Sequence, residues 1–137
     1  VMDPITFRNF CLSLNCTEER FPFDENTLVF YVGSKMFCLV DIDTFQSFNV
    51  KCDPEVAVEL RERFEEVCPG YHMNKKHWNT VSLTGNLPDH LILKWIQDSY
   101  DLVVAGLPKK LKESICRNSN KVLKDLNDSD HQDLIGA

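Results

Sequence analysis

The sequence contains no long apolar run, no CxxC motif and no glycine-rich loop, and each absence excludes a class of protein. Its apolar stretches, such as "LVFYV" at 28–32, are far shorter than the roughly 20 residues that a membrane-spanning helix needs. The first residues, "VMDPITF", lack the basic and apolar regions of a secretory signal peptide. We therefore expect a protein of the cytoplasm with no membrane partner.

Cysteine and glycine usage gives no sign of a metal or a cofactor. The chain has six cysteines, but Cys38 lies in an apolar run typical of a strand, so we interpret the thiols as reduced and partly buried. Cys68, His72 and His77 are the one loosely metal-like group, and their spacing matches no standard zinc pattern. Gly33 and Gly70 stand alone, without a phosphate-binding motif around them. We predict no metal site and no cofactor.

Basic residues are scarce, and they are unevenly distributed. The formal net charge is -6, with residues 1–69 carrying 6 Lys and Arg against 13 Asp and Glu. Residues 70–124 carry 9 basic against 4 acidic residues, a net charge of +5, and the last 13 residues contain four Asp and no basic residue. This confinement of positive charge argues against a general nucleic-acid coat but allows local binding of an anion.

Three helices are indicated by capping signals and apolar spacing. Asp3-Pro4 and Asp53-Pro54 each combine an N-cap with proline at the first helical position, so helices are expected to begin there. The first should end near residue 15, and the second should run to Pro69-Gly70 with its apolar stripe at Val56, Leu60, Phe64 and Val67. A third helix is predicted from about residue 88 to Gly106, and a more basic helical segment follows it.

The strands are expected to form an antiparallel sheet. The segment "TLVFYVGSKMFCLVDID" contains two apolar runs joined by "GSK", which is typical of a β-hairpin, and "SFNVKC" would add a third strand. "TEERFPFDENT" is interpreted as a polar connector, and residues 80–83 as a further strand. Hairpin connections join antiparallel neighbours, so the predicted fold class is α+β: a three-stranded meander plus a further hairpin, covered by helices. We expect a single domain at 2–118 and a C-terminal extension at 119–137, acidic at its end.

The blocks "KCDPEVAVELRERFEEVCPGYHMNKKHWNTVSL" and "SYDLVVAGLPKK" give the chain a family resemblance. Together with "FPFD" and "KMFCLVD", they make residues 2–112 similar to the MmcQ/YjbR family of small bacterial proteins. The resemblance implies a YjbR-like single α+β domain with a double-wing-like arrangement and a capacity to bind DNA.

The segment "PGYHMNKKHWNTVSL" at 69–83 concentrates reactive side chains, yet it offers no reaction. No Ser or Cys nucleophile is tied to a base by a recognisable pattern, and Cys68 lies near His72 in sequence without any sign of a triad. We therefore predict a non-enzymatic protein in which Tyr71 and Trp78 pack and the His side chains bind loop backbone.

Nucleic acid is the leading predicted partner, through a basic hairpin at residues 72–79. Lysines and His there would contact phosphates, the two asparagines would donate to phosphates or base edges, and the tryptophan would stack on a base only if its ring is exposed. A second basic cluster near 109–124 would extend the footprint or form the solvated face of a helix. The predicted contact residues are Asn74, Lys75, Lys76, His77, Trp78, Asn79, Lys109 and Lys110.

Binding of that kind is expected to be weak, non-specific and sensitive to salt, since about 3 to 5 phosphate contacts give a log–log salt slope of roughly -3 to -5. The alternative is a non-enzymatic protein-interaction or small-ligand-binding module. A groove beside "FPFD" and "YHMNKKHW", with Trp78, Tyr71 and Arg20 as anchors, would take a peptide or a second copy of the chain.

Overall fold

The computed structural model describes residues 2–115, and the chain divides into two compact units, Val1–Gly106 and Leu107–Ala137. Of the second unit only 107–115 is described, and it is helical from residue 109 to 115. The predicted boundary after residue 118 and the extension at 119–137 lie outside the described residues. Everything below concerns the first unit unless the second is named.

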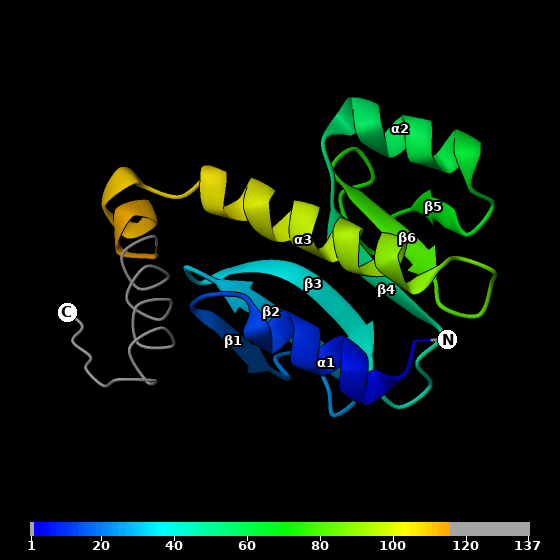
Figure 1. The fold of residues 1–137 in the computed structure, drawn as a ribbon, viewed down its shortest axis with the longest axis horizontal. Helices are drawn as coiled ribbons and strands as arrows, with labels where there is room; N and C mark the ends of the chain where they lie inside the picture. The colour runs from blue at the N-terminus through cyan, green and yellow to red at the C-terminus, as the bar shows by residue number, and fades with distance from the viewer. Residues whose placement is uncertain (1, 116–137) are drawn as a thin grey trace, which may run out of the picture. The chain divides into compact units, whose positions relative to one another are not determined.

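The first unit is built on one six-stranded antiparallel sheet (Figure 1). Its strands lie in the order β1-β2-β3-β4-β6-β5, so β1 to β4 form a meander and β5 and β6 form a hairpin added through β6. The strands are β1 (Thr17–Arg20), β2 (Thr27–Val32), β3 (Lys35–Asp41), β4 (Ser47–Lys51), β5 (Val67–Pro69) and β6 (Trp78–Ser82). The predicted α+β class with an antiparallel sheet is confirmed.

A two-residue turn and a bulge set the register of the central hairpin. Gly33 and Ser34 both have positive φ, 58° and 66°, which is the backbone that a tight hairpin turn of the primed type requires. The register then shifts beyond Tyr31, where β3 accommodates one extra residue. Because of this bulge, the neighbours Phe37 and Cys38 are both fully buried.

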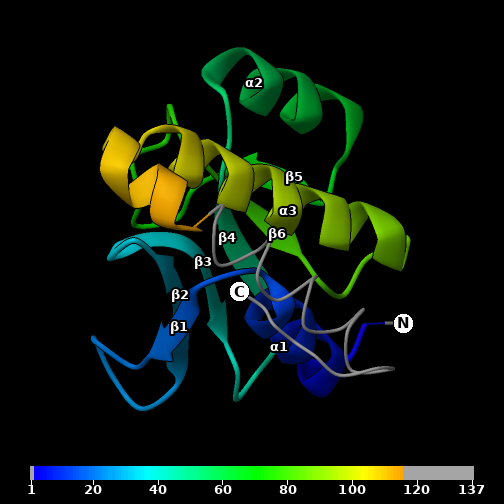
Figure 2. The same cartoon turned by 60° about the vertical axis from the view of Figure 1, so that its left-hand side comes forward.

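Three helices, α1 (Pro4–Ser13), α2 (Pro54–Arg63) and α3 (Asp89–Ala105), pack on one face of the sheet. The caps predicted for the first two are present: the Asp3 carboxylate accepts from the Thr6 amide, and the Asp53 carboxylate accepts from two amides of α2. Figures 1 and 2 show α2 standing apart from α3, close to β5 and β6.

The main core lies between α1, α3 and the sheet, and aromatic rings dominate it. The Phe7 ring of α1 meets Phe48 of β4 edge-on at 5.2 Å, and the Tyr100 ring of α3 meets Phe37 of β3 at 5.3 Å. On the other face of the sheet, Val29, Leu39 and Trp78 form a smaller cluster that is covered by Tyr31, Met36 and Met73.

Two expectations about element boundaries are wrong. Residues 17–20, expected to be connector, form the edge strand β1, paired with β2. The second helix ends at Arg63, because the backbone of Phe64 turns to an extended conformation, and Val67 then belongs to β5. The predicted stripe therefore loses one member, and only Ala57 of α2 is buried.

Candidate functional site

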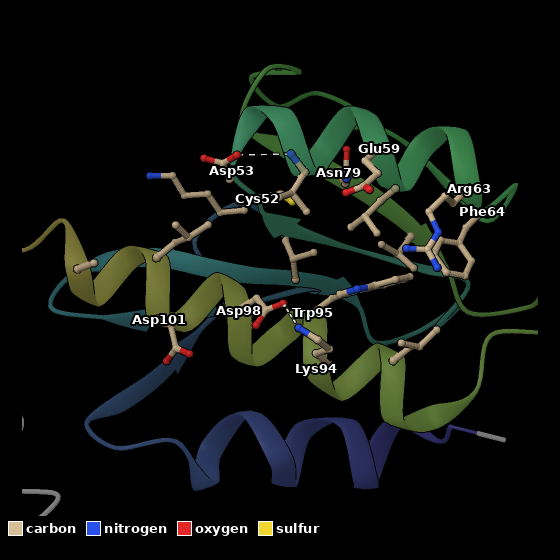
Figure 3. A pocket seen from close by; sticks show the side chains of 18 residues that line it. Cys52, Asp53, Glu59, Arg63, Phe64, Asn79, Lys94, Trp95, Asp98 and Asp101 are labelled. Atoms are coloured by element: carbon tan, nitrogen blue, oxygen red, sulfur yellow. Dashed lines mark hydrogen bonds and ion pairs between the residues drawn. The ribbon is translucent and has the colours of Figure 1, made fainter.

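A groove of about 560 Å³ opens between α2 and α3 above the sheet (Figure 3). Its floor is formed by Val50 of β4 and Val81 of β6, neighbours on the helix-covered face. On α3, the lining residues from Leu91 to Ala105 recur every three or four positions, so they follow one face of the helix. These fifteen residues span fourteen helical rises, which make this wall about 21 Å long.

The walls of the groove are apolar and partly open to solvent. Val56 of α2 and Leu102 of α3 line it from opposite sides, and their exposed fractions are 42% and 37%. Leu60 adds to the α2 wall, so the apolar stripe of this helix faces the groove and not a close-packed neighbour. An amphipathic helix normally buries such a stripe, and here it stays accessible.

Aromatic contact closes the groove at one end. The Phe64 ring, just after α2, meets the Trp95 ring of α3 edge-on with centroids 5.2 Å apart, and the guanidinium of Arg63 lies over Phe64 at 5.3 Å. Trp95 itself is 7% exposed. Side chains therefore bridge the two helices here, and we call the opposite end of the groove, at the start of α2 and the end of α3, the wide end.

Carboxylates gather at the wide end. Asp53 begins α2, and Asp98 of α3 accepts from the Lys94 ammonium at 2.9 Å, an ion pair that raises the Lys94 pKa. The pKa of the Cys52 thiol is raised to about 11, mainly by burial and then by the carboxylates of Asp53 and Asp98, while Arg61 acts in the opposite direction. The thiol is thus neutral at physiological pH.

A half-buried arginine anchors α2 to the sheet. The Arg61 guanidinium donates to the Asn79 side-chain oxygen at 2.7 Å and to the carbonyls of Trp78 and Lys75. The Asn79 amide in turn faces the Ala57 carbonyl at 3.4 Å, a long contact. Since α2 buries only one side chain, this polar network holds it in place.

The basic loop, residues 70–77 between β5 and β6, is bound largely to itself. Asn74 accepts from the amides of Lys76, His77 and Trp78, and the Lys75 ammonium donates to the Gly70 carbonyl at 3.0 Å. A Cβ at Gly70 would lie 2.8 Å from Cβ of Trp78, so only glycine fits here without a shift. The loop is a compact hairpin connection.

The predicted nucleic-acid contacts divide between surface and interior. Asn74, Lys75 and Lys76 are exposed and His77 is partly buried. Trp78 is 9% exposed and packs beneath the loop, which agrees with the expectation that this ring packs.

Asn79 is 1% exposed and is held by Arg61, so neither it nor Trp78 can touch a nucleic acid in this conformation. The exposed ring of this loop is Tyr71, at 67%, in contact with the His72 ring at 3.9 Å, so the expectation that Tyr71 packs is wrong.

Lys109 and Lys110 lie in the second unit, at the start of its helical segment, and both are exposed. Among residues 2–115, no three His, Cys, Asp or Glu side chains are grouped so as to hold a metal ion. Within the same range, no helix is both long and apolar enough to cross a membrane.

Sequence reasoning missed the groove. The stripe at Val56, Leu60 and Phe64 was visible, but periodicity says only that a helix has an apolar face, and it does not say whether another element covers that face. In the sequence, Asp98 and Asp101 are equally consistent with the solvated side of an amphipathic helix, so they did not indicate a binding site.

Comparison with known proteins identifies the relatives of this chain. A model of the YjbR family matches residues 12–102. The uncharacterized protein YbdF of Escherichia coli O157:H7 is 35% identical over 106 residues, covering 77% of this chain and 87% of YbdF. The uncharacterized protein YjbR of Escherichia coli K12 is 30% identical over 105 residues, covering 76% of this chain and 89% of YjbR.

Solved structures show the same fold. Deinococcus radiodurans protein DR2400, whose crystal structure is assigned to domain family DUF419, superposes with a TM-score of 0.77 at 39% identity, covering 82% of this chain and 87% of DR2400. A Pseudomonas syringae protein gives a TM-score of 0.63 at 28% identity, covering 74% of this chain and 98% of that one. The fold and the family match agree with the resemblance seen in the sequence, and the chain belongs to the YjbR family.

Proposed function

We propose that the protein is a non-catalytic binding module that holds a small apolar ligand in the groove between α2 and α3. One observation carries the proposal: Val56 of α2 and Leu102 of α3 line the same cavity and remain substantially exposed. A ligand between them would remove apolar surface from water on both walls and on the floor, which is the main source of affinity for such sites.

The size of the groove suits a small molecule. Its 560 Å³ lies within the range of roughly 300 to 1,000 Å³ that is usual for small-ligand sites.

The chemistry of the lining supports binding without catalysis. Cys52 is the one thiol among the lining residues, and its pKa of about 11 keeps it protonated and a poor nucleophile at neutral pH. No His, Ser or Thr belongs to the lining. The groove therefore offers no nucleophile paired with a base.

Binding of octan-1-ol, measured by displacement of the neutral dye N-phenyl-1-naphthylamine, tests the proposal. Val56→Gln and Leu102→Gln each remove apolar wall and should weaken octanol binding about fivefold, since about 40 Å² of lost contact is worth about 1 kcal/mol. Val58→Gln is the matched control, because Val58 is 48% exposed on the same helix and does not line the groove. It should change affinity less than about twofold.

Either of two results would contradict the proposal. If no neutral apolar probe binds, or if the Val58 variant weakens binding as much as the two groove variants, the ligand does not occupy the groove. Circular dichroism melting curves of all variants provide the folding control, and the three substitutions are on exposed positions where small effects on stability are expected.

DNA binding at the basic loop is the second candidate, and the exposed side chains of Lys76 and Tyr71 favour it. With few available phosphate contacts, binding should be weak, non-specific and salt-sensitive. Fluorescence polarisation with duplex and single-stranded DNA at about 50 mM and 200 mM salt checks it, and the signal should fall severalfold between them. No binding at the lower salt would remove this candidate.

A protein partner or a second copy of the chain is the remaining form of the binding-module hypothesis. Exposed Phe21 and Phe23, at 49% and 65%, lie in the connection after the edge strand β1 and would be the contact residues. Light scattering at increasing concentration addresses self-association: a constant monomer mass would count against a second copy as the partner.

A further inference from the structure

The charged rim of the groove is uneven from one end to the other. At the closed end, the Arg63 guanidinium is stacked on Phe64. At the wide end, Asp98 and Asp101 line the groove three residues apart on α3, close enough to repel each other. Figure 3 shows Cys52 between Asp53 and Asp98, and the Cys52 pKa is raised first by burial and then by these two carboxylates.

The cations at this end do not neutralise all three carboxylates. The Lys94 ammonium pairs with Asp98, whereas Asp101 accepts from the neutral amide of Gln97 at 3.0 Å. Lys51 also lines the groove, so two ammonium groups stand against the three carboxylates at this end. The Asp53 charge is partly offset by the amides of α2 that it caps.

Two further features make the electrostatic potential at this end of the groove more negative. The carbonyl end of α3 lies beside Ala105 at this end of the groove, and the last turn of the helix contains no basic residue to offset its negative dipole. Residues 1–106 as a whole carry 9 Lys and Arg against 16 Asp and Glu, a net charge of -7. The potential at the wide end is therefore negative, with Asp101 as its least compensated charge.

Resting on the proposed function, we infer that the ligand of this groove is a small organic cation: an apolar body between Val56 and Leu102, with a protonated amine near Asp98 and Asp101. The amine stays within reach of water at the wide end, so it need not be fully desolvated, and it lowers the repulsion between the two carboxylates. The apolar body points toward the Phe64–Trp95 contact. An anionic head group in the same position would meet uncompensated carboxylate.

Three probes that share an eight-carbon chain separate charge from apolar contact. At pH 7 octylamine is cationic, octan-1-ol neutral and octanoate anionic, and dye displacement measures each below its micelle-forming concentration. Octylamine should bind about fivefold more tightly than octanol, and octanoate more weakly than either, since one uncompensated charge at partly screened distance changes affinity by about this factor. The preference should shrink as salt rises from about 0.05 M to 0.5 M.

Asp101→Asn is the decisive variant. It should reduce the ratio of octylamine to octanol affinity about threefold, because the rim loses a charge that attracts the cation and does not attract the neutral alcohol. Glu62→Gln is the matched control, since Glu62 is an exposed carboxylate of α2 that does not line the groove. Its ratio should change less than about 1.5-fold.

The outcomes distinguish this inference from the proposed function. If octanol binds and octylamine is not preferred, or if octanoate is preferred, the ligand is not a cation. The proposed binding of an apolar ligand in the groove would then still hold. A preference for octylamine that Asp101→Asn does not reduce also overturns the cation assignment, because the charge then acts from elsewhere. If none of the three probes binds, both the inference and the proposed function fail.

Discussion

The groove and the basic loop contrast in what they leave accessible. In the groove, apolar side chains such as Val56 that could have formed core remain open to solvent. In the loop, polar groups that could have faced a partner are bound to the protein itself, as Lys75 is to Gly70 and Asn74 to Lys76. The loop has the more reactive side chains in the sequence, yet its polar groups already form hydrogen bonds within the protein.

Residue type alone is therefore a poor guide to a binding surface. A polar side chain is available to a ligand only if the backbone around it has not already taken its hydrogen bonds, and an apolar side chain signals a ligand only if no element covers it. Both conditions depend on tertiary structure.

Arg61→Met should lower the free energy of unfolding by about 2 to 3 kcal/mol, because the side-chain oxygen of Asn79 and the carbonyls of Trp78 and Lys75 would lose a charged donor. Since Arg61 connects α2 with the loop, both regions should loosen together. Urea unfolding gives the stability, and hydrogen exchange of amides in α2 and 70–77 gives the local effect.

Arg63→Met is the control for that experiment. Arg63 lies two residues away on the same helix, exposed, with its guanidinium over Phe64, and its loss should cost less than about 1 kcal/mol. Equal destabilisation by the two variants would contradict the assignment of Arg61 as the anchor of α2.

The Cys52 thiol should make stability fall in alkaline solution. Its pKa in the folded state is about 11, above the ordinary value of 9.0, so between these values the thiol ionises first in the unfolded chain. The contribution is complete below pH 9 and is lost as the pH rises toward 11. Because the thiol is only half buried, we expect a loss of about 1 kcal/mol between pH 8 and 10.5.

Cys52→Ser removes this dependence and should flatten that part of the stability curve. Urea unfolding of both proteins at pH 8 and pH 10.5 gives the comparison. Parallel curves for the two proteins would show that the thiol does not titrate in this range, and would contradict the half-buried position of Cys52 beside two carboxylates.

In the loop, Lys76→Ala should affect DNA binding more than Lys75→Ala. The Lys76 ammonium is exposed, whereas the Lys75 ammonium is already bound to the Gly70 carbonyl. Each lost phosphate contact lowers the slope of log affinity against log salt by about 1. We expect that change for Lys76 and a smaller one for Lys75, and the reverse order would show that the loop rearranges on binding.

Much of the fold was predictable from local signals. Asp3-Pro4 and Asp53-Pro54 mark helix starts because an Asp side chain can cap amides and proline needs no donor at the first turn. Gly33 marks the central hairpin because a tight turn there requires positive φ. These signals act within a few residues, so the sequence states them directly.

The features that the sequence did not predict depend on residues that are distant along the chain. The strand "TEER" has no apolar alternation, and it is a strand because β2 offers it an edge to pair with. Asn79 was assigned to an exposed contact surface by sequence, and its burial follows from its place beside Arg61 of α2. The groove lies between two helices whose side chains meet at Phe64 and Trp95, a contact that no local pattern records.

The two tryptophans allow the most direct test of ligand binding in the groove, since Trp95 lines the groove and Trp78 lies beneath the basic loop. Their indole N–H signals can be followed separately in a nitrogen–proton correlation spectrum during titration with octan-1-ol. The account predicts that the Trp95 signal moves with saturation while the Trp78 signal stays in place. Movement of Trp78 alone, or of neither signal, would contradict it.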